Sequence, residues 1–401
     1  MGSVRHVTSP AGFSAAGVKC GIKASGKNDL AVIVCDTDAS AAIVTTRNQV
    51  VGAPVIYIRK IMPRGYGVAR AMVVNSGCSN VCTGAAGVKD AQTMARLVAK
   101  AVKTDAKKVL VASTGIIGHR LPMDKVRAGI AAATSSLGTD NDDQVVKAIM
   151  TTDTREKTAL VTARIGGKDI TVAGIVKGSG MIAPSMATMI GVITTDVAIS
   201  PPALHKALVE VSNESFNAIT VDSDTSTSDT VAVFASGLAG NKPISAGSAD
   251  WRKFRSLLGE VCGELARSVV IDGEGATKLV KITVLGARNA AEARIAAVSV
   301  ANSPLFKCAM HGGDPNWGRI AAALGKSSAK IDPSHLKIAI GGVTIFTNGG
   351  GRKFDLPRVE SHLKGMEIDV ECNLGLGKGS FTALTCDLSR EYVAINADYS
   401  T

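Results

Sequence analysis

The chain has 401 residues, 46% of them hydrophobic, and can therefore bury one large core or two ordinary ones. Its 45 basic and 34 acidic side chains leave a net charge of +11, but Lys and Arg never form a run longer than two, and only 3% of the residues are aromatic. Proteins that bind nucleic acid gather basic residues on one face and stack bases on aromatic side chains, so we expect no nucleic-acid partner. The 42 glycines and the aliphatic core residues fit a layered α/β protein.

The first half of the chain alternates predicted strands and helices. Short apolar runs bounded by Gly, Asn, Asp or Pro predict strands at 30–35, 41–45, 55–58 and 71–74. Apolar residues at helical spacing predict an amphipathic helix at 88–102, and a strand predicted at 108–112 runs into Ser113-Thr114-Gly115. Helices are then expected at 122–133 and 142–150, and strands at 159–165 and 170–176.

The second half continues this alternation. A strand is expected after residue 188, followed by a helix that opens at Ser200-Pro201-Pro202 and runs toward Phe216. Next come a strand at 231–235, a helix at 249–270, a strand at 279–284 and a helix at 290–301. The last eighty residues are predicted to be rich in strands, at 337–345, 367–371 and 392–394. Alternation without a break in composition predicts a mixed α/β (α+β) fold.

The cysteines and histidines indicate which cellular compartment and which kinds of metal site to expect. The eight cysteines are thinly spread and the six histidines show no zinc-ligand spacing, so we predict free thiols in a reducing compartment and no metal. The first 19 residues lack the continuous apolar stretch of a signal peptide, which favours a cytoplasmic protein. Residues 178–195 carry no charge, but their serines, threonines, proline and glycines argue against a membrane span, which needs about 20 mainly apolar residues.

Thr188 follows Ala187 inside that uncharged run, in the segment KGSGMIAPSMATM at 177–189. A threonine hydroxyl is a poor nucleophile unless a base removes its proton, and cleavage of the Ala187–Thr188 bond would create an α-amine on the same residue. With a pKa of about 7.7–8, that amine can act as a base near neutral pH. The residues alone leave two interpretations open, a buried strand pair and a self-cleavage site.

The segment resembles the cleavage site of the ornithine acetyltransferase family, also called the glutamate N-acetyltransferase family of arginine biosynthesis. Seven further segments resemble family motifs in the family's order: VVNSG at 73–77, STGIIG at 113–118, TTDT at 151–154, DSDTSTSDT at 222–230, IDGEGATK at 271–278, DPNWGRI at 314–320 and YVAINADYST at 392–401. The resemblance covers essentially the whole chain. The sequence departs from the family pattern at Cys78, Ser79, Ser185 and Ser223, none of which is a proposed catalytic group.

The resemblance implies an αββα-type sandwich like that of amidases with an N-terminal nucleophile, in two intimately packed parts. It implies self-cleavage into an alpha chain of residues 1–187 and a beta chain of residues 188–401, two of each per molecule. It also implies that Thr188 takes an acetyl group from N2-acetyl-L-ornithine and passes it to L-glutamate without a cofactor. Acetyl-CoA stays open as a further donor, which would make the enzyme bifunctional. The alternative is an autoprocessing threonine amidase or aminopeptidase, in which water replaces glutamate as the acceptor.

The predicted catalytic groups besides Thr188 are Thr114 and Gly115. They sit where a strand enters a turn, so a hydroxyl and a backbone N–H can point together at a developing oxyanion. A plain turn stabilised by a threonine hydroxyl is the alternative on spacing alone.

The resemblance assigns substrate contacts to six residues: Thr151, Lys177, Thr188, Glu274, Asn396 and Thr401. The residues themselves allow other interpretations, because Lys177 could be a solvated flank and Glu274 part of a surface turn. Thr152 and Asp153 are close enough in register to be confused with Thr151. The acidic group Asp222, Asp224 and Asp229 lacks a calcium-loop pattern, and we expect it to stabilise turns.

Overall fold

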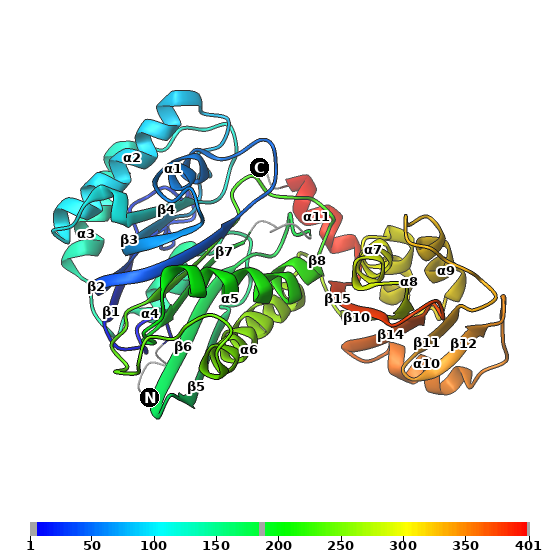
Figure 1. Cartoon of the computed structure of the whole chain (residues 1–401). Helices are drawn as coiled ribbons and strands as arrows, with labels where there is room; N and C mark the ends of the chain where they lie inside the picture. The colour runs from blue at the N-terminus through cyan, green and yellow to red at the C-terminus, as the bar shows by residue number, and fades with distance from the viewer. Residues whose placement is uncertain (1–5, 184–188, 399–401) are drawn as a thin grey trace.

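The computed structural model describes residues 6–183 and 189–398, which form two β-sheets with helices packed on them (Figure 1). This confirms the predicted mixed α/β class. In Figure 1 the first sheet lies among the blue to green segments and the second mainly among the yellow to red ones, with its short green strand β8 (Ile219–Thr220) and helix α6 (Ala249–Ile271) near their junction. Helix α6 packs on strands of both sheets, so the two parts are in direct contact.

The first sheet has eight strands in the described part of the chain, in the order β4-β3-β2-β9-β7-β6-β5 with β1 added on β2. They are β1 (Phe13–Val18), β2 (Leu30–Thr45), β3 (Tyr66–Asn75), β4 (Val109–Ser113), β5 (Thr158–Ile165), β6 (Lys168–Lys177), β7 (Ile190–Thr195) and β9 (Thr230–Ala235). The β3–β4 and β7–β9 pairs are parallel and the others are antiparallel.

Helices cover both faces of this sheet. Successive side chains of a strand point to opposite faces, and in β9 Ala232 and Phe234 join one core while Val231 and Val233 join the other. The first core includes side chains of α1 (Ala53–Ile61), α2 (Gly84–Ala101), α3 (Met123–Ser135) and α4 (Asp142–Ile149). The second includes α5 (Pro201–Glu214) and α6.

The second sheet has the order β13-β12-β11-β14-β10-β15-β8. Its strands are β8 (Ile219–Thr220), β10 (Leu279–Ala287), β11 (Lys337–Ile340), β12 (Val343–Thr347), β13 (Gly350–Gly351), β14 (Glu367–Asn373) and β15 (Gly379–Cys386). Helices α7 (Ala290–Ala301), α8 (Pro304–Gly312), α9 (Trp317–Gly325) and α10 (Leu356–Leu363) complete its core, and α11 (Arg390–Asp398) follows β15.

Two predicted strands are wrong, because both segments are helices. Residues 55–58 lie in α1, where Pro54 occupies the first turn and supplies a helical φ. Residues 392–394 lie in α11, whose first turn carries Glu391, a favourable charge at a helix N-terminus. An apolar run of three or four residues has no periodicity of its own, so length and flanking residues had to decide in both cases.

Other boundaries also differ from the prediction. The runs at 30–35 and 41–45 belong to the single strand β2, whose pairing with β3 shifts register between Val34 and Ala39. The run at 337–345 is instead two strands, because Gly341 and Gly342 have φ of 56° and 76° and form a two-residue hairpin turn. Strands β1 and β15 and helices α8, α9 and α10 were not predicted. The last eighty residues contain strands β11 to β15, as the expected richness in strands requires, together with helices α10 and α11.

Residues from both sides of position 188 build the first sheet. Strands β7 and β9 follow that position, yet β7 pairs with β6 and β9 pairs with β2. A cut after residue 187 would therefore leave two polypeptides that share one sheet and its two cores. Among the described residues, no helix combines the length and apolarity required to cross a membrane.

Candidate active site

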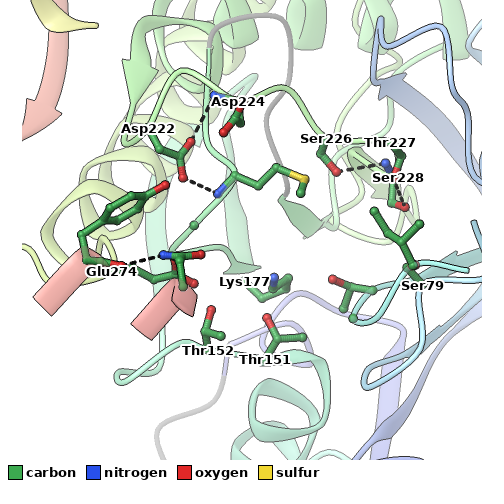
Figure 2. A pocket seen from close by; sticks show the side chains of 17 residues that line it. Ser79, Thr151, Thr152, Lys177, Asp222, Asp224, Ser226, Thr227, Ser228 and Glu274 are labelled. Atoms are coloured by element: carbon green, nitrogen blue, oxygen red, sulfur yellow. Dashed lines mark hydrogen bonds between the residues drawn. The ribbon is translucent and has the colours of Figure 1, made fainter. Parts of the chain in front are cut away.

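A cavity of about 210 Å³ opens where several strands of the first sheet reach the same edge. Lys177 at the end of β6 pairs with Ile190, which pairs with Thr230 at the start of β9, so these three positions lie side by side. Six predicted site residues line the cavity: Thr114, Gly115, Thr151, Lys177, Glu274 and Asn396. Figure 2 shows Thr151, Lys177 and Glu274 around it. The predicted residues Ala187, Thr188 and Thr401 lie outside the described residues.

The Thr114–Gly115 turn is fixed by its neighbours. The Thr114 N–H donates to the Asn75 carbonyl oxygen at 3.0 Å, and the Thr114 side chain is buried. Gly115 has φ of +123°, and a Cβ there would lie 2.4 Å from the carbonyl carbon of Gly77. Only glycine fits that close approach in that conformation. The turn is therefore rigid and faces the cavity, as an oxyanion-binding group must.

Ser79, a departure from the family pattern, also lines the cavity. Its backbone N–H and its hydroxyl both donate to the Ile116 carbonyl oxygen, at 3.0 and 2.8 Å. The substitution therefore adds a bond that ties the segment after Gly77 to the Thr114–Gly115 turn.

Lys177 is buried, and the groups around it set its charge. Desolvation lowers the pKa of its ammonium, the Asp153 carboxylate opposes that change, and the Lys157 ammonium adds to it. Burial would raise the pKa of Asp153, but Lys177 and Lys157 hold it well below its usual value. Burial therefore favours the neutral amine of Lys177 and the Asp153 carboxylate favours its ammonium, so a second anion from solution would favour the ammonium further.

Thr151 and Thr152 both border the cavity, and their hydrogen bonds separate their roles. The Thr152 hydroxyl lies 2.7 Å from the Ser179 hydroxyl. Within the part of the chain that the structure describes, the Thr151 hydroxyl has no such partner, whereas its N–H donates to Asp153 at 2.8 Å. Thr151 is therefore the threonine of this pair that is better placed to bind a ligand.

Glu274 and Asn396 form one contact between distant segments. The Asn396 side-chain amide donates to Glu274 Oε2 at 2.8 Å, and the Glu274 N–H donates to the Ser179 carbonyl oxygen at 2.9 Å. Gly180 packs against this carboxylate, because a Cβ built on it would lie 2.2 Å from Glu274 Oε2. The carboxylate thus has a defined position in the wall and spare acceptor capacity for a ligand cation.

Asp222 stabilises its own turn, as expected, by accepting the Asp224 N–H at 3.2 Å, and it also borders the cavity. Its carboxylate accepts backbone N–H groups from Met181 at 2.6 Å and Ile182 at 2.9 Å. Burial nevertheless raises the pKa of Asp222 to about 6. Ser223, another departure from the family pattern, has φ of +66°, a conformation that glycine adopts without strain. Sequence reasoning had not placed Asp222, Asp224 or Tyr392 in the cavity wall.

Asp229 anchors the residue that follows Thr188 in the sequence. Its Oδ1 accepts the Met189 N–H at 3.0 Å, and its Oδ2 is buried. Burial raises the pKa of Asp229 well above its usual value, against the attraction of Lys177. Burial thus disfavours the ionised form of this carboxylate, which lies next to the predicted cleavage site.

Together these residues can bind a small zwitterion. The wall offers the Lys177 amino group, the carboxylates of Asp222, Asp224 and Glu274, and several hydroxyl groups. A ligand with both a carboxylate and an ammonium can satisfy each charge in such a wall. The nearby Thr114–Gly115 turn could bind an oxyanion, so the cavity suits acyl transfer between amino acids.

Sequence comparisons with known proteins cover nearly the whole chain. A model of the ArgJ family matches residues 14–401. "Arginine biosynthesis bifunctional protein ArgJ" of Geobacillus stearothermophilus is 44% identical over 398 residues, which are 98% of this chain and 96% of the relative. Two solved structures are also similar. An argJ protein from Bacillus halodurans has 40% identity and a TM-score of 0.50, over 51% of this chain and 97% of that one. An ornithine acetyltransferase from Mycobacterium tuberculosis, complexed with ornithine, has 42% identity and a TM-score of 0.40, over 45% of this chain and 95% of that one.

Proposed function

This chain belongs to the ArgJ family, and we propose that it moves an acetyl group from N2-acetylornithine to glutamate through an acetyl ester of Thr188. The general role follows from the family: the chain is an acetyltransferase of arginine biosynthesis. The observation that carries the specific reaction is the convergence of Lys177, Glu274 and the Thr114–Gly115 turn on one cavity. The two amino acids that bind in turn each carry a carboxylate for Lys177 and a positive or hydrogen-bonding group for Glu274.

The proposed reaction has two transfer steps. In the first, the Thr188 hydroxyl attacks the acetamide carbon of acetylornithine while the free α-amine of Thr188 takes the hydroxyl proton. The tetrahedral oxyanion is stabilised by Thr114 and Gly115, the C–N bond breaks, and ornithine leaves with the proton. In the second, the glutamate amine attacks the acetyl-threonine ester, and the threonine oxygen leaves and regains a proton. Because one amide is exchanged for another, the overall reaction is close to thermoneutral.

The free amine of Thr188 requires prior cleavage after Ala187. We propose that the Thr188 hydroxyl attacks the Ala187 carbonyl, that the acyl group moves from nitrogen to oxygen, and that water hydrolyses the resulting ester. The hydrogen bond from Met189 to Asp229 supports this, because it fixes the backbone directly after Thr188. The Bacillus halodurans comparison supports it too, since 97% of that chain matches only 51% of this one and the compared polypeptide is about half as long.

Three finer features belong to the same proposal. The two fragments, 1–187 and 188–401, stay together through their shared sheet, with two copies of each per molecule. The protein acts in the cytoplasm, where amino-acid biosynthesis supplies its substrates. The word "bifunctional" in the names of the relatives favours a second activity, and we assign this to acetyl-CoA as an alternative acetyl donor.

The deciding assay separates a transferase from a threonine amidase. Purified protein is incubated with acetylornithine, with and without glutamate, and both acetylglutamate and free acetate are measured. We expect acetylglutamate to form in step with ornithine and little acetate to appear. Acetate release at the same rate in both samples would instead support the amidase.

A further inference from the structure

Lys157 lies just before β5 and is the centre of a buried ion cluster beside the cavity. Its side chain is 1% exposed, and those of Asp153 and Asp272 are 0% and 3% exposed. Its ammonium donates to Asp153 Oδ1 at 2.7 Å, to Asp272 Oδ2 and to the Arg155 carbonyl oxygen at 3.3 Å. An ammonium has three N–H donors, so all of them are used within the protein.

The two carboxylates extend this cluster to three segments that line the cavity. Asp153 accepts the N–H of Thr151 at 2.8 Å and the N–H of Gly178, the residue after Lys177, at 2.7 Å. Asp272 accepts the N–H of Thr154 at 3.0 Å and lies two residues before Glu274. One cation thus connects the backbones that carry Thr151, Lys177 and Glu274.

Burying three ions costs hydration free energy, so a function has to explain why this cluster is charged. Each buried ion loses several kcal/mol of hydration, and an apolar cluster of similar volume is often at least as stable. None of Asp153, Lys157 and Asp272 lines the cavity, so substrate contact does not explain their presence. A buried ionic network does, however, fix the relative positions of the segments it joins, because an alternative packing would leave a charge unpaired.

We propose that Lys157 is a positioning residue for acetyl transfer, and that it holds Thr151, Lys177 and Glu274 in register through Asp153 and Asp272. This inference rests on the function proposed above. Asp153 and Lys157 precede position 188 and Asp272 follows it, so after cleavage the cluster also locks the two fragments together across the substrate cavity. Catalysis needs this precision, since a misplacement of about 1 Å can cost about 10²-fold in rate.

Two variants test the role. Asp272→Asn removes one charge of the cluster and keeps the side-chain shape. The double variant Lys157→Met with Asp272→Asn removes one positive and one negative charge, so it leaves no uncompensated ion. Asp196→Asn is the matched control, because Asp196 is also a buried carboxylate that accepts a backbone N–H, from Thr171 at 3.0 Å, near the opposite end of β6 from Lys177.

Steady-state kinetics and thermal melting are measured for each protein after cleavage is complete. We expect both cluster variants to raise KM for acetylornithine about tenfold and to lower kcat/KM by about 10- to 100-fold, at temperatures where all samples are folded. The control should keep kcat and KM within about twofold of wild type, whatever its melting temperature.

The outcomes separate this inference from the proposed function. If the wild-type protein transfers no acetyl group, the proposed function fails. If wild type is active and either folded cluster variant keeps its KM and kcat, the positioning role is overturned. Equal losses in the cluster variants and the control would also overturn it, because the effect would then be general destabilisation. Should the double variant not fold, the Asp272→Asn result decides alone.

Discussion

Gly180 offers a test of the Glu274 contact in which no charged residue is replaced. An alanine Cβ at this position would lie 2.2 Å from Glu274 Oε2 and 2.5 Å from Oε1, whereas ordinary contacts exceed 3.4 Å. The carboxylate must therefore move by about 1 Å or more, which breaks its 2.8 Å hydrogen bond with Asn396 and misaligns it toward the cavity. The displaced carboxylate would also lose its hydrogen bond to the substrate. A hydrogen bond to a charged group contributes about 1.5–3 kcal/mol, so Gly180→Ala should weaken substrate binding by about 10- to 150-fold.

The same substitution should not destabilise the protein. Gly180 does not have a positive φ, and the colliding atoms are the free end of a flexible side chain. Where the backbone conformation permits it, replacing glycine by alanine stabilises the folded protein by about 0.4–1 kcal/mol, because it lowers the conformational entropy of the unfolded chain. We therefore expect a higher KM with an unchanged or slightly raised melting temperature. Gly263→Ala in α6 is the control, since its Cβ would meet nothing within 4 Å. A wild-type KM in Gly180→Ala would refute the assignment of Glu274 to substrate binding.

Three further predictions follow from the site. Thr114→Ala should lower kcat by about 10²–10³-fold with a much smaller change in KM, and an unchanged kcat would place the oxyanion donors elsewhere. Burial raises the pKa of Asp222 from 3.8 to about 6, so the folded state binds its proton more tightly than the unfolded state does. The unfolding free energy of wild type should therefore fall by about 3 kcal/mol relative to Asp222→Asn as the pH rises from about 3 to about 7, and denaturant titrations showing the same pH slope for both proteins would contradict this. Deletion of residues 396–401 removes the partner of Glu274 from α11, a helix without buried side chains among its described residues, and should abolish acetyl transfer while self-cleavage, seen by electrophoresis, continues. A folded truncated enzyme with normal acetylglutamate production would argue against that assignment.

Local pattern predicted most elements of the fold, and resemblance supplied the site. Strands β6 and β9 contain longer apolar runs and the long helix α6 has helical periodicity, whereas α1 and α11 contain apolar runs too short to distinguish a helix from a strand. The motif containing Lys177 was recognisable because its residues are consecutive in the chain.

The groups that support the site could not be found in that way. Lys157 meets Asp272 across 115 residues and Met189 meets Asp229 across 40, so neither contact leaves a local pattern. The TTDT motif had drawn attention to Asp153 only as a possible confusion with Thr151. A pairing rule for buried charges could have indicated that Asp153 and Lys157 act together, since they are four residues apart, but not that Asp272 completes the cluster.

Detection of an acetyl ester on Thr188 tests the proposed mechanism most directly. The purified protein is incubated with acetylornithine in the absence of glutamate, quenched in acid, and its fragments are analysed by mass spectrometry with N-terminal sequencing. We predict two fragments, 1–187 and 188–401, with one acetyl group on the Thr188 side chain of the second. Addition of glutamate should remove that group and yield acetylglutamate. An uncleaved chain with full transferase activity, or a cleaved one whose acetyl group never resides on Thr188, would contradict the mechanism.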